Sequence, residues 1–576
     1  MNAPQHPWWR PDALPWQSHA WSIELRHDEL AEIRFAGRPL LRSIRAVVRD
    51  RGWLTVPAVV TERVLGDNGL RLELRHAELG AEITSTLSVE ATATTLRVTW
   101  SARNRVPFDT CRTGLVALHP AAAAGTALTV EHGDGSEETT VFPTRIRPWQ
   151  PVDDIRALRV TAEGVPAEIR FAGDVFEMED QRNWSDASFK TYSRPLALPF
   201  PYPLAANETV EQSILLRVED AAPARAAASV NTITLTEHGP VPEIGLEAST
   251  APDPVPAVRL GRFRVVELDL RTPNWSAALD RAARDGLPLD VRLVSDGAEA
   301  PLRAAARALA AHEILRVTPA ETVLHITDTD LAARTQAALD TAGVRAPLGA
   351  GSRAHFTELN REQHRMPTGL DDLTVITTPL FHSTDTEQLV ESLAMQRLIA
   401  EHTVSIADGR RVHLGPVSLR PRFNSAATVP PALPERGDLA EGYGAQFTGS
   451  DDPRQRSAEL AAWTVASAAA LLVPGVTSAS WFETVGPRGV LSSAGSAAPA
   501  RDALAALGEL HGRTLLSGPH AEGTLWAVGG RGAVDDLVLV ANVGRDARTL
   551  TLRLGDEETI ISIPAGQWQR LALPRP

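Results

Sequence analysis

Cysteine and long apolar runs are both nearly absent from this sequence. Cys111 is the only cysteine among 576 residues, so neither an intramolecular disulfide nor a cluster of thiolate metal ligands can form. The most apolar stretch, residues 466–476, is interrupted by Pro474 and is far shorter than the ~20 residues that cross a bilayer. The first residues lack an apolar run behind a basic start, so we predict no secretory signal. These absences predict a cytoplasmic protein that neither spans nor enters a membrane.

Positive charge is also in deficit. The chain has 71 acidic and 57 basic side chains and a net charge of -14. Such a field repels phosphate backbones and anionic lipid surfaces, so we predict no nucleic-acid partner. Hydrophobic residues make up 43% of the chain and charged residues 22%, which is typical of a globular protein. The length exceeds that of a single core, which predicts two to four domains.

The first third of the chain alternates between apolar and polar residues with a period of two. Leu70, Leu72 and Leu74 form one such run, and Asn68-Gly69 before it is typical of a tight hairpin turn. This pattern predicts an N-terminal β-sandwich over residues 1–239. Five prolines follow with little apolar periodicity, so we predict a linker over residues 240–261.

After residue 262, short apolar runs alternate with amphipathic helices, as in parallel βα units. The predicted strands are 263–270, 289–294, 315–319, one ending at 355–360, 373–381, 412–419, 479–482 and a weak eighth at 489–491. Eight units over about 250 residues predict a TIM (β/α)8 barrel at 262–514, with a doubly wound open sheet as the alternative. Alternation returns in 515–576 and predicts a small C-terminal β domain. The predicted fold class is therefore α/β plus all-β.

Two carboxylates follow predicted barrel strands, where the active sites of such barrels lie. Glu358 follows the fourth predicted strand and Glu483 the seventh. A carboxyl pair supplies a general acid and a base or nucleophile, and this layout resembles the large barrel clan of retaining glycosidases. The alternative for both residues is a structural ion pair, with Arg361 or Arg488.

Further polar residues lie near the same predicted strand ends. His382 closes the fifth strand and could act as a base, an orienting group or a substrate ligand, or be a buried hydrogen-bonded histidine. Arg422 follows the sixth strand and could clamp a carboxylate, polarise a carbonyl oxygen or form a salt bridge. Asn360 and Trp481, beside the two glutamates, are candidate substrate ligands. Motifs of serine hydrolases, zinc proteases and nucleotide enzymes are absent. We predict no cofactor and no metal, with a divalent ion held by carboxylates and His382 as the alternative.

The densest polar segment lies in the N-terminal domain, at residues 176–192. From composition alone it suits a hydroxyl-rich ligand, a solvated loop or an interdomain seam closed by salt bridges. The run Glu179-Asp180-Gln181-Arg182-Asn183-Trp184-Ser185-Asp186-Ala187-Ser188-Phe189-Lys190-Thr191-Tyr192 resembles the signature of the D-apionate lactonase family. Residues 114–120, 356–361 and 482–484 extend the resemblance into the barrel.

This resemblance implies an N-terminal domain, a TIM barrel and a C-terminal domain, and hydrolysis of D-apionolactone to D-apionate in the breakdown of apiose. A lactonase needs a base, a group that stabilises the oxyanion and an acid. We expect Glu358 and Glu483 to be acid and base, and His382, Arg422 or Lys190 to stabilise the oxyanion. The expected ligands of the small sugar-lactone substrate in the signature are Asp180, Arg182, Asn183, Trp184 and Asp186. The alternatives are a retaining glycoside hydrolase that uses the two barrel glutamates and a non-catalytic carbohydrate-binding protein.

Overall fold

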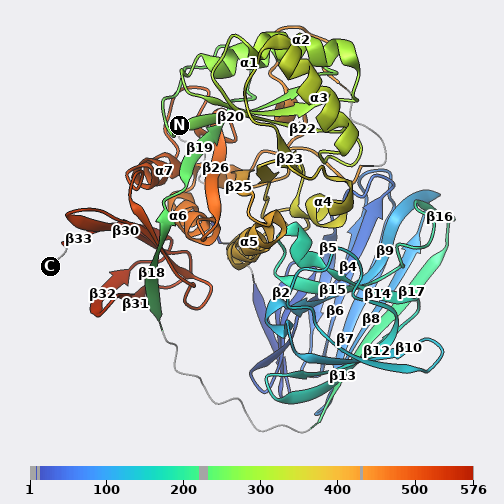
Figure 1. The fold of residues 1–576 in the computed structure, drawn as a ribbon. Coiled ribbons are helices and arrows are strands. Elements are labelled where there is room, and N and C mark those ends of the chain that lie inside the picture. The colour runs from blue at the N-terminus through green and yellow to red at the C-terminus, as the bar shows by residue number, and fades with distance from the viewer. Residues whose placement is uncertain (1–7, 10–12, 220–230, 428–432, 575–576) are drawn as a thin grey trace.

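The computed structural model describes residues 8–9, 13–219, 231–427 and 433–574. Three units are visible in Figure 1: a β-sandwich, a barrel with helices around it and a small β domain that carries the C-terminus. Within the described residues, no helix is both long and apolar enough to span a bilayer.

The N-terminal unit is a sandwich in which seventeen strands form one continuous hydrogen-bonded network. The period-two pattern explains its core, because alternate residues of each strand face inward: Leu70, Leu72 and Leu74 are all buried while their neighbours are not. The strands are β1 Leu14–Ser18, β2 Trp21–Arg26, β3 Glu29–Phe35, β4 Arg38–Asp50, β5 Val59–Leu65, β6 Gly69–His76, β7 Ile83–Ala91, β8 Thr95–Asn104, β9 Phe108–Pro120, β10 Ala127–His132, β11 Glu137–Val141, β12 Val152–Ala162, β13 Val165–Ala172, β14 Phe176–Asp180, β15 Ser188–Ser193, β16 Tyr202–Leu204 and β17 Thr209–Val218.

The middle unit is the predicted TIM barrel. Its strands are β19 Glu243–Glu247, β20 Phe263–Asp269, β21 Leu289–Val294, β22 Ile314–Ala320, β23 Gly349–Gly351, β24 Asp372–Val375, β25 Arg411–Val417 and β26 Val476–Val485. All neighbours pair in parallel, β19 pairs with both β20 and β26, and a bridge between Val317 and Leu348 joins β22 to the segment before β23. The helices are α1 Trp275–Ala283, α2 Glu299–Leu309, α3 Thr329–Ala342, α4 Phe356–Arg361, α5 Thr386–Ala407, α6 Glu459–Leu471 and α7 Ala500–Gly508.

The order of the barrel strands differs from the prediction. The first strand, β19, lies inside the predicted linker 240–261, and its neighbouring prolines flank it without interrupting it. The structure assigns no helix between β19 and β20, so the βα rhythm that revealed the other strands is missing there. The predicted fourth strand is the short helix α4, and the predicted eighth is β27 (Gly489–Leu491), which pairs only with β26. Because β19 is the first strand of the barrel, each strand that follows it has a barrel position one higher than the predicted one.

The C-terminal unit is a seven-stranded sheet in the order β32-β31-β18-β28-β29-β30-β33. Its strands are β18 Thr232–Pro240, β28 Thr514–Ser517, β29 Leu525–Arg531, β30 Asp535–Asn542, β31 Arg548–Leu554, β32 Glu557–Ile563 and β33 Gln567–Pro574. Strand β18 falls within the range predicted for the N-terminal domain, yet it pairs with β28 and β31 (Figure 1). The chain thus contributes one strand to this sheet before it enters the barrel.

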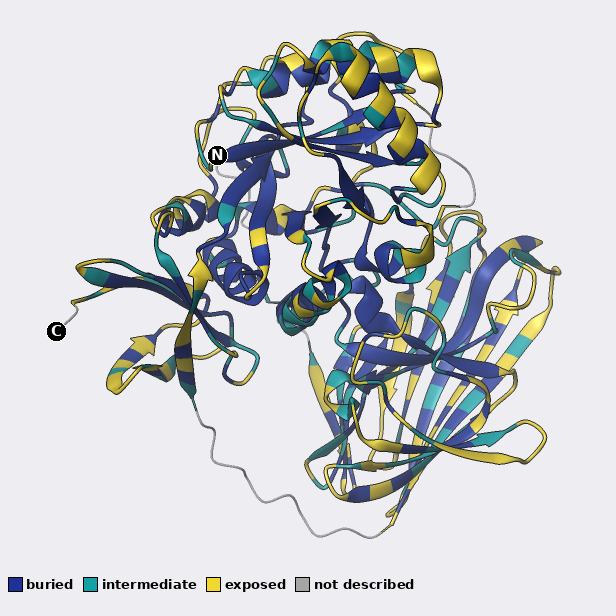
Figure 2. Cartoon of the chain, viewed as in Figure 1, coloured by how far each residue is buried: buried dark blue, intermediate teal, exposed yellow. Residues whose placement is uncertain are grey.

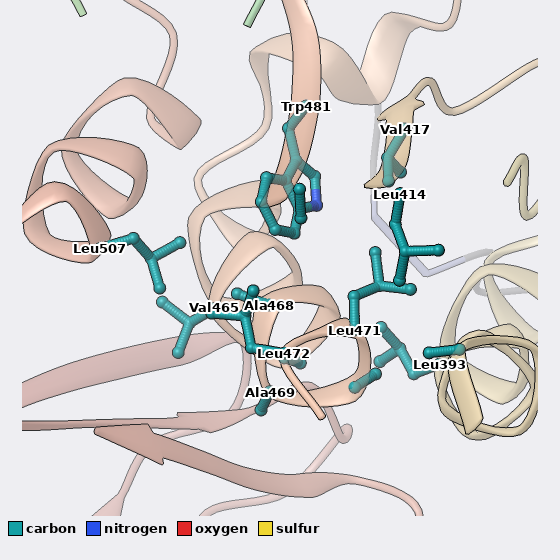
Figure 3. Close-up of a cluster of buried hydrophobic side chains, with 14 of the residues drawn as sticks. Leu393, Leu414, Val417, Val465, Ala468, Ala469, Leu471, Leu472, Trp481 and Leu507 are labelled. Atoms are coloured by element: carbon teal, nitrogen blue, oxygen red, sulfur yellow. The ribbon is translucent and has the colours of Figure 1, made fainter. Parts of the chain in front are cut away.

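The largest apolar core joins the barrel to the C-terminal sheet through α6. Every residue of this helix after Glu459 is buried, whereas the outer helices α1–α3 expose one face to solvent (Figure 2). Figure 3 shows α6 residues packed between α5, α7 and the barrel strands. Trp481 belongs to this core, because it is fully buried and its indole N–H donates to Ser467 Oγ of α6 at 2.9 Å. Trp481 therefore lies outside the site, contrary to the prediction.

Candidate active site at the domain interface

A cavity of about 70 Å³ lies between the sandwich and the barrel, and we call it the interface pocket. Its barrel side comes from the loop after β24 and the start of α5, at the end of the barrel where active sites lie. Its sandwich side comes from β3, β4, β9, β15 and the signature segment. The lining residues are Glu29, Arg42, Ser43, Arg45, Val47, Arg49, Arg112, Val116, Leu118, Gln181, Asp186, Lys190, His382, Ser383 and Gln388.

The alternation of side chains along strand β4 places Arg45 and Arg49 on the face that lines the pocket. Ile44, Ala46 and Val48 face the sandwich core and are almost fully buried, so Arg45, Val47 and Arg49 face the other way and line the cavity. The sequence signal was an arginine at every third or fourth position of an apolar strand, at 38, 42, 45 and 49, which the sequence analysis missed.

Two of the pocket cations form no ion pair with a carboxylate of the described residues. Arg49 and Arg112 stand directly opposite each other on β4 and β9. Arg49 donates to the carbonyl of Trp53 at 2.9 Å, and Arg112 stacks on the Tyr192 ring at 3.7 Å. Burial, followed by the nearby Arg112 charge, lowers the pKa of Arg49 to about 10. By contrast, Arg45 forms a bidentate pair with Asp28 at 2.8 and 2.9 Å.

Lys190 is the only lysine of the whole chain. It extends from β15, is 6% exposed and forms an ion pair with Glu179. Burial lowers the pKa of Lys190 to about 8 against the opposing effect of Glu179, and the Arg112 and Arg49 charges lower it further. All the remaining Lys or Arg positions of the chain are arginine. At position 190 the chain has a compact ammonium, which titrates more readily and carries three rotatable donors.

His382 and Asp186 meet across the domain boundary. The imidazole Nδ1 lies 2.7 Å from the Asp186 carboxylate, so the carboxylate accepts the Nδ1 proton and leaves the lone pair on Nε2. Burial lowers the pKa of His382, although Asp186 opposes the shift. The ring is therefore neutral at pH 7 and oriented as a base. This pair brings together one residue of the predicted signature and one of the predicted barrel residues.

Part of the signature forms an interdomain seam, as the alternative interpretation held. Arg182 binds both oxygens of Asp180 at 2.7 Å and is 2% exposed. Asn183 accepts from the Asn360 side chain at 2.9 Å. The Trp184 indole stacks on Phe381 with ring centroids 4.4 Å apart. These contacts engage five of the predicted ligands with protein groups, and none of the five lines the interface pocket: Asp180, Arg182, Asn183, Trp184 and Asn360.

Glu358 lies on a helix and not at a strand end. It is the third residue of α4, where its carboxylate accepts from the backbone N–H of His355 at 2.9 Å in a capping box. Burial raises the pKa of Glu358 to about 7. Arg361 does not pair with it but donates to the carbonyl of Pro148 at 2.7 Å.

Glu483 belongs to a second cluster, which we call the mouth cluster: Glu247, Glu267, Arg353, Arg422, Glu483 and Arg488. The Glu483 carboxylate accepts from Arg488 at 2.6 Å and from the Thr250 hydroxyl at 2.7 Å, so the predicted alternative ion pair with Arg488 is present. Arg422 joins Glu247 to Glu267. The cavity beside these residues measures about 10 Å³, which is room for about one water molecule.

A β-bulge turns Glu483 into the barrel. The pairing of β19 and β26 shifts between Leu246 opposite Trp481 and Glu247 opposite Glu483, so Phe482 is the extra residue. Its φ of 45° marks the bulge. Without it, Glu483 would point outward like Trp481, since side chains two apart share a face. The bulge thereby places Glu247 beside Glu483, and burial with this neighbouring charge raises the pKa of Glu247 to about 7.

The barrel positions of Glu358 and Glu483 differ from the predicted glycosidase layout. Glu483 lies on the eighth barrel strand and Glu358 follows the fifth, so the two do not occupy the ends of strands four and seven. The sequence analysis missed Glu247 and Glu267, although each is an acid within or at the end of an apolar strand.

Known proteins resemble this chain over most of its length. Residues 5–221 match the model of the D-apionate lactonase N-terminal domain, and residues 241–512 match that of the D-apionate lactonase TIM barrel domain. A D-apionate lactonase from Brucella anthropi is 30% identical over 521 residues, which cover 82% of this chain and 83% of the relative. The chain belongs to the D-apionate lactonase family. It is therefore a lactonase, as the signature segment predicted.

Solved structures give more distant likenesses to parts of this lactonase. A GH30 endoxylanase from Clostridium papyrosolvens is 8% identical and covers 60% of this chain and 99% of its own, with a TM-score of 0.40. A galactose mutarotase-like protein from Lactobacillus casei is 9% identical and covers 36% of this chain and 100% of its own, with a TM-score of 0.27.

Within the part of the lactonase that the structure describes, no group of three or more His, Cys, Asp or Glu side chains is arranged to hold a metal ion. The prediction of a metal-free reaction remains a prediction, which dialysis against a chelator would test.

Proposed function

We propose that this lactonase opens D-apionolactone to D-apionate in the cytoplasmic breakdown of apiose, and that the reaction takes place in the interface pocket. The observation that carries the proposal is the His382–Asp186 pair, which lines the same cavity as the only lysine of the chain. The name of the 30% identical relative supports the substrate.

The pocket holds one group for each step of lactone hydrolysis. His382 Nε2 takes a proton from water while the water oxygen attacks the lactone carbonyl carbon. The resulting oxyanion is stabilised by the Lys190 ammonium, with Arg49 and Arg112 nearby. As the intermediate collapses, the ring C–O bond breaks and the imidazolium returns its proton to the leaving alkoxide. The product is a hydroxy acid, ionised at neutral pH.

This proposal changes the roles expected for the two glutamates. Glu358 fixes the start of α4, whose Thr357 and Asn360 contact the signature segment. Glu483 fixes the end of β26 through Thr250 and Arg488. Both are positioning residues here, while His382 is the catalytic residue.

The test is an NMR time course with D-apionolactone, related aldonolactones and a panel of aryl glycosides. Wild type should open the lactone, and His382→Gln should lower kcat/KM by about 10²–10⁴, the range for loss of a general base. Glu313→Gln, an exposed glutamate at the opposite end of the barrel, is the matched control and should leave the rate unchanged.

Two further variants locate the site. If Glu358→Gln and Glu483→Gln abolish turnover in correctly folded protein while His382→Gln retains it, the reaction belongs to the barrel glutamates and the proposed pocket is wrong. Glycoside cleavage without lactone opening would make the chain a glycoside hydrolase. Saturable sugar binding without any turnover would make it a binding protein.

A further inference from the structure

The cross-strand pair of Arg49 and Arg112 is an unusual feature of the interface pocket. Like charges directly opposite each other on neighbouring strands destabilise a sheet. The residues of β4 from Ser43 to Asp50 pair with β9, with a shift in register after Arg49, and the neighbouring pairs are Val48 opposite Thr113 and Asp50 opposite Thr110. The facing pairs Ser43–Leu118 and Arg45–Val116 line the cavity as well, but only at Arg49–Arg112 do two cations face each other in this pairing.

One donor of the pair also has no hydrogen-bond partner. Arg112 is 4% exposed, and its Nε has no hydrogen-bond partner among the described residues. A buried donor without a partner is unfavourable, and a buried charge without one is more so. A bound anion would remove both costs, because a carboxylate accepts from guanidinium groups in the fork geometry that arginine presents.

The rest of the lining selects among anions. Glu29 and Asp186 are carboxylates that also line the cavity, so a dianion such as phosphate meets repulsion there. The same two acids, with Gln181 and Ser383, can instead accept from or donate to hydroxyl groups. The combination suits one carboxylate on a short chain that carries hydroxyls.

We propose that the interface pocket binds a small hydroxy acid, with its carboxylate between Arg49 and Arg112 and its hydroxyls toward Asp186 and Lys190. This is the chemical class of the product of lactone opening, so the pocket retains its product. The inference goes beyond the proposed function, because binding needs no turnover and holds in a variant that cannot catalyse.

The first experiment is calorimetric titration of the full chain with sodium D-apionate, sodium D-glycerate, inorganic phosphate and glycerol. The two hydroxy acids should bind saturably and glycerol should not. Arg49→Gln and Arg112→Gln should each weaken binding at least ten-fold. Arg97→Gln, an exposed arginine on β8 of the same domain, should leave it unchanged. Equal affinity in the wild type and both pocket variants, or binding of phosphate but not of the acids, would overturn the proposal.

The single lysine supplies a second readout in the unmodified protein. Reductive methylation labels primary amines, so Lys190 and the α-amino group are the only targets. D-glycerate should slow methylation of Lys190 and leave that of the α-amino group unchanged, as measured by mass spectrometry. Equal rates at Lys190 with and without a bound acid would contradict the proposed pose even if a pocket variant failed to fold.

His382→Gln separates this inference from the proposed function. If the variant loses turnover and still binds D-glycerate, both stand. If wild type binds the acid but opens no lactone, only the proposed function fails. If wild type opens lactones with no saturable binding of acids and no protection of Lys190, only the inference fails.

Discussion

The mouth cluster and the interface pocket are both rich in arginine, but their charges are arranged in opposite ways. In the mouth cluster Arg353 binds both oxygens of Glu267 at 2.6 and 3.1 Å, and Arg422 joins Glu267 to Glu247. In the interface pocket Arg49 and Arg112 face each other without a carboxylate between them. Paired buried charges hold strand ends in place, whereas unpaired ones raise the energy of the empty site. The first arrangement suits a scaffold and the second suits a ligand.

Arg422→Gln should break the mouth cluster and have the largest effect on stability. Glu247 would lose its guanidinium partner in a buried setting, and removal of one partner of a buried ion pair costs about 3–5 kcal/mol. Urea titration should show this fall in the free energy of unfolding. Arg422→Lys should recover part of it, since the charge remains but the planar fork is lost. An unchanged unfolding midpoint in Arg422→Gln would show that the cluster contributes nothing to the fold.

The pH profile of kcat/KM should report the interface pocket and not the mouth cluster. His382 must be neutral and, because its pKa is lowered, the acid limb should lie below pH 6.5. Lys190 must be charged, and because its pKa is about 8 the rate should fall above pH 8. About ten-fold should be lost by pH 9 to 9.5 once spontaneous lactone hydrolysis is subtracted.

Lys190→Arg gives this prediction its control. The guanidinium stays charged throughout the range, so the alkaline limb should disappear even where the maximal rate is lower. An alkaline limb that persists in Lys190→Arg would assign it to another group. An acid limb centred near pH 7 that is lost in Glu358→Gln would move the base to the barrel.

Arg49→Gln should have the smallest effect on the free energy of unfolding, and it tests the difference between the interface pocket and the mouth cluster. Removing one of two opposed charges relieves repulsion of up to about 1 kcal/mol, so the free energy of unfolding should stay the same or rise slightly. The same substitution that destabilises the mouth cluster would then be neutral or stabilising in the interface pocket. A loss comparable with that of Arg422→Gln would show that Arg49 is paired in solution.

Sequence patterns identified local structure well and strand order poorly. The alternation of Leu70, Leu72 and Leu74 is a local property of one strand, because burial of one sheet face dictates it. Strand β19 left no such trace, since it is short, is flanked by prolines and has no helix after it. Because β19 was not predicted, Glu358 and Glu483 were assigned to the fourth and seventh strands instead of the fifth and eighth. Lys190 was named as an expected site residue, but its being the only lysine was a composition signal left unused.

The sequence by itself determined the three kinds of domain and the family, because the hydrophobic period and the long polar signature are local properties of the sequence. Only the tertiary structure decided which polar residues meet. Asp186 and His382 are 196 positions apart, and Arg49 meets Arg112 through strand register. Such pairs depend on sheet pairing and domain docking, and contacts between residues far apart in the chain leave no mark in the local pattern of either segment.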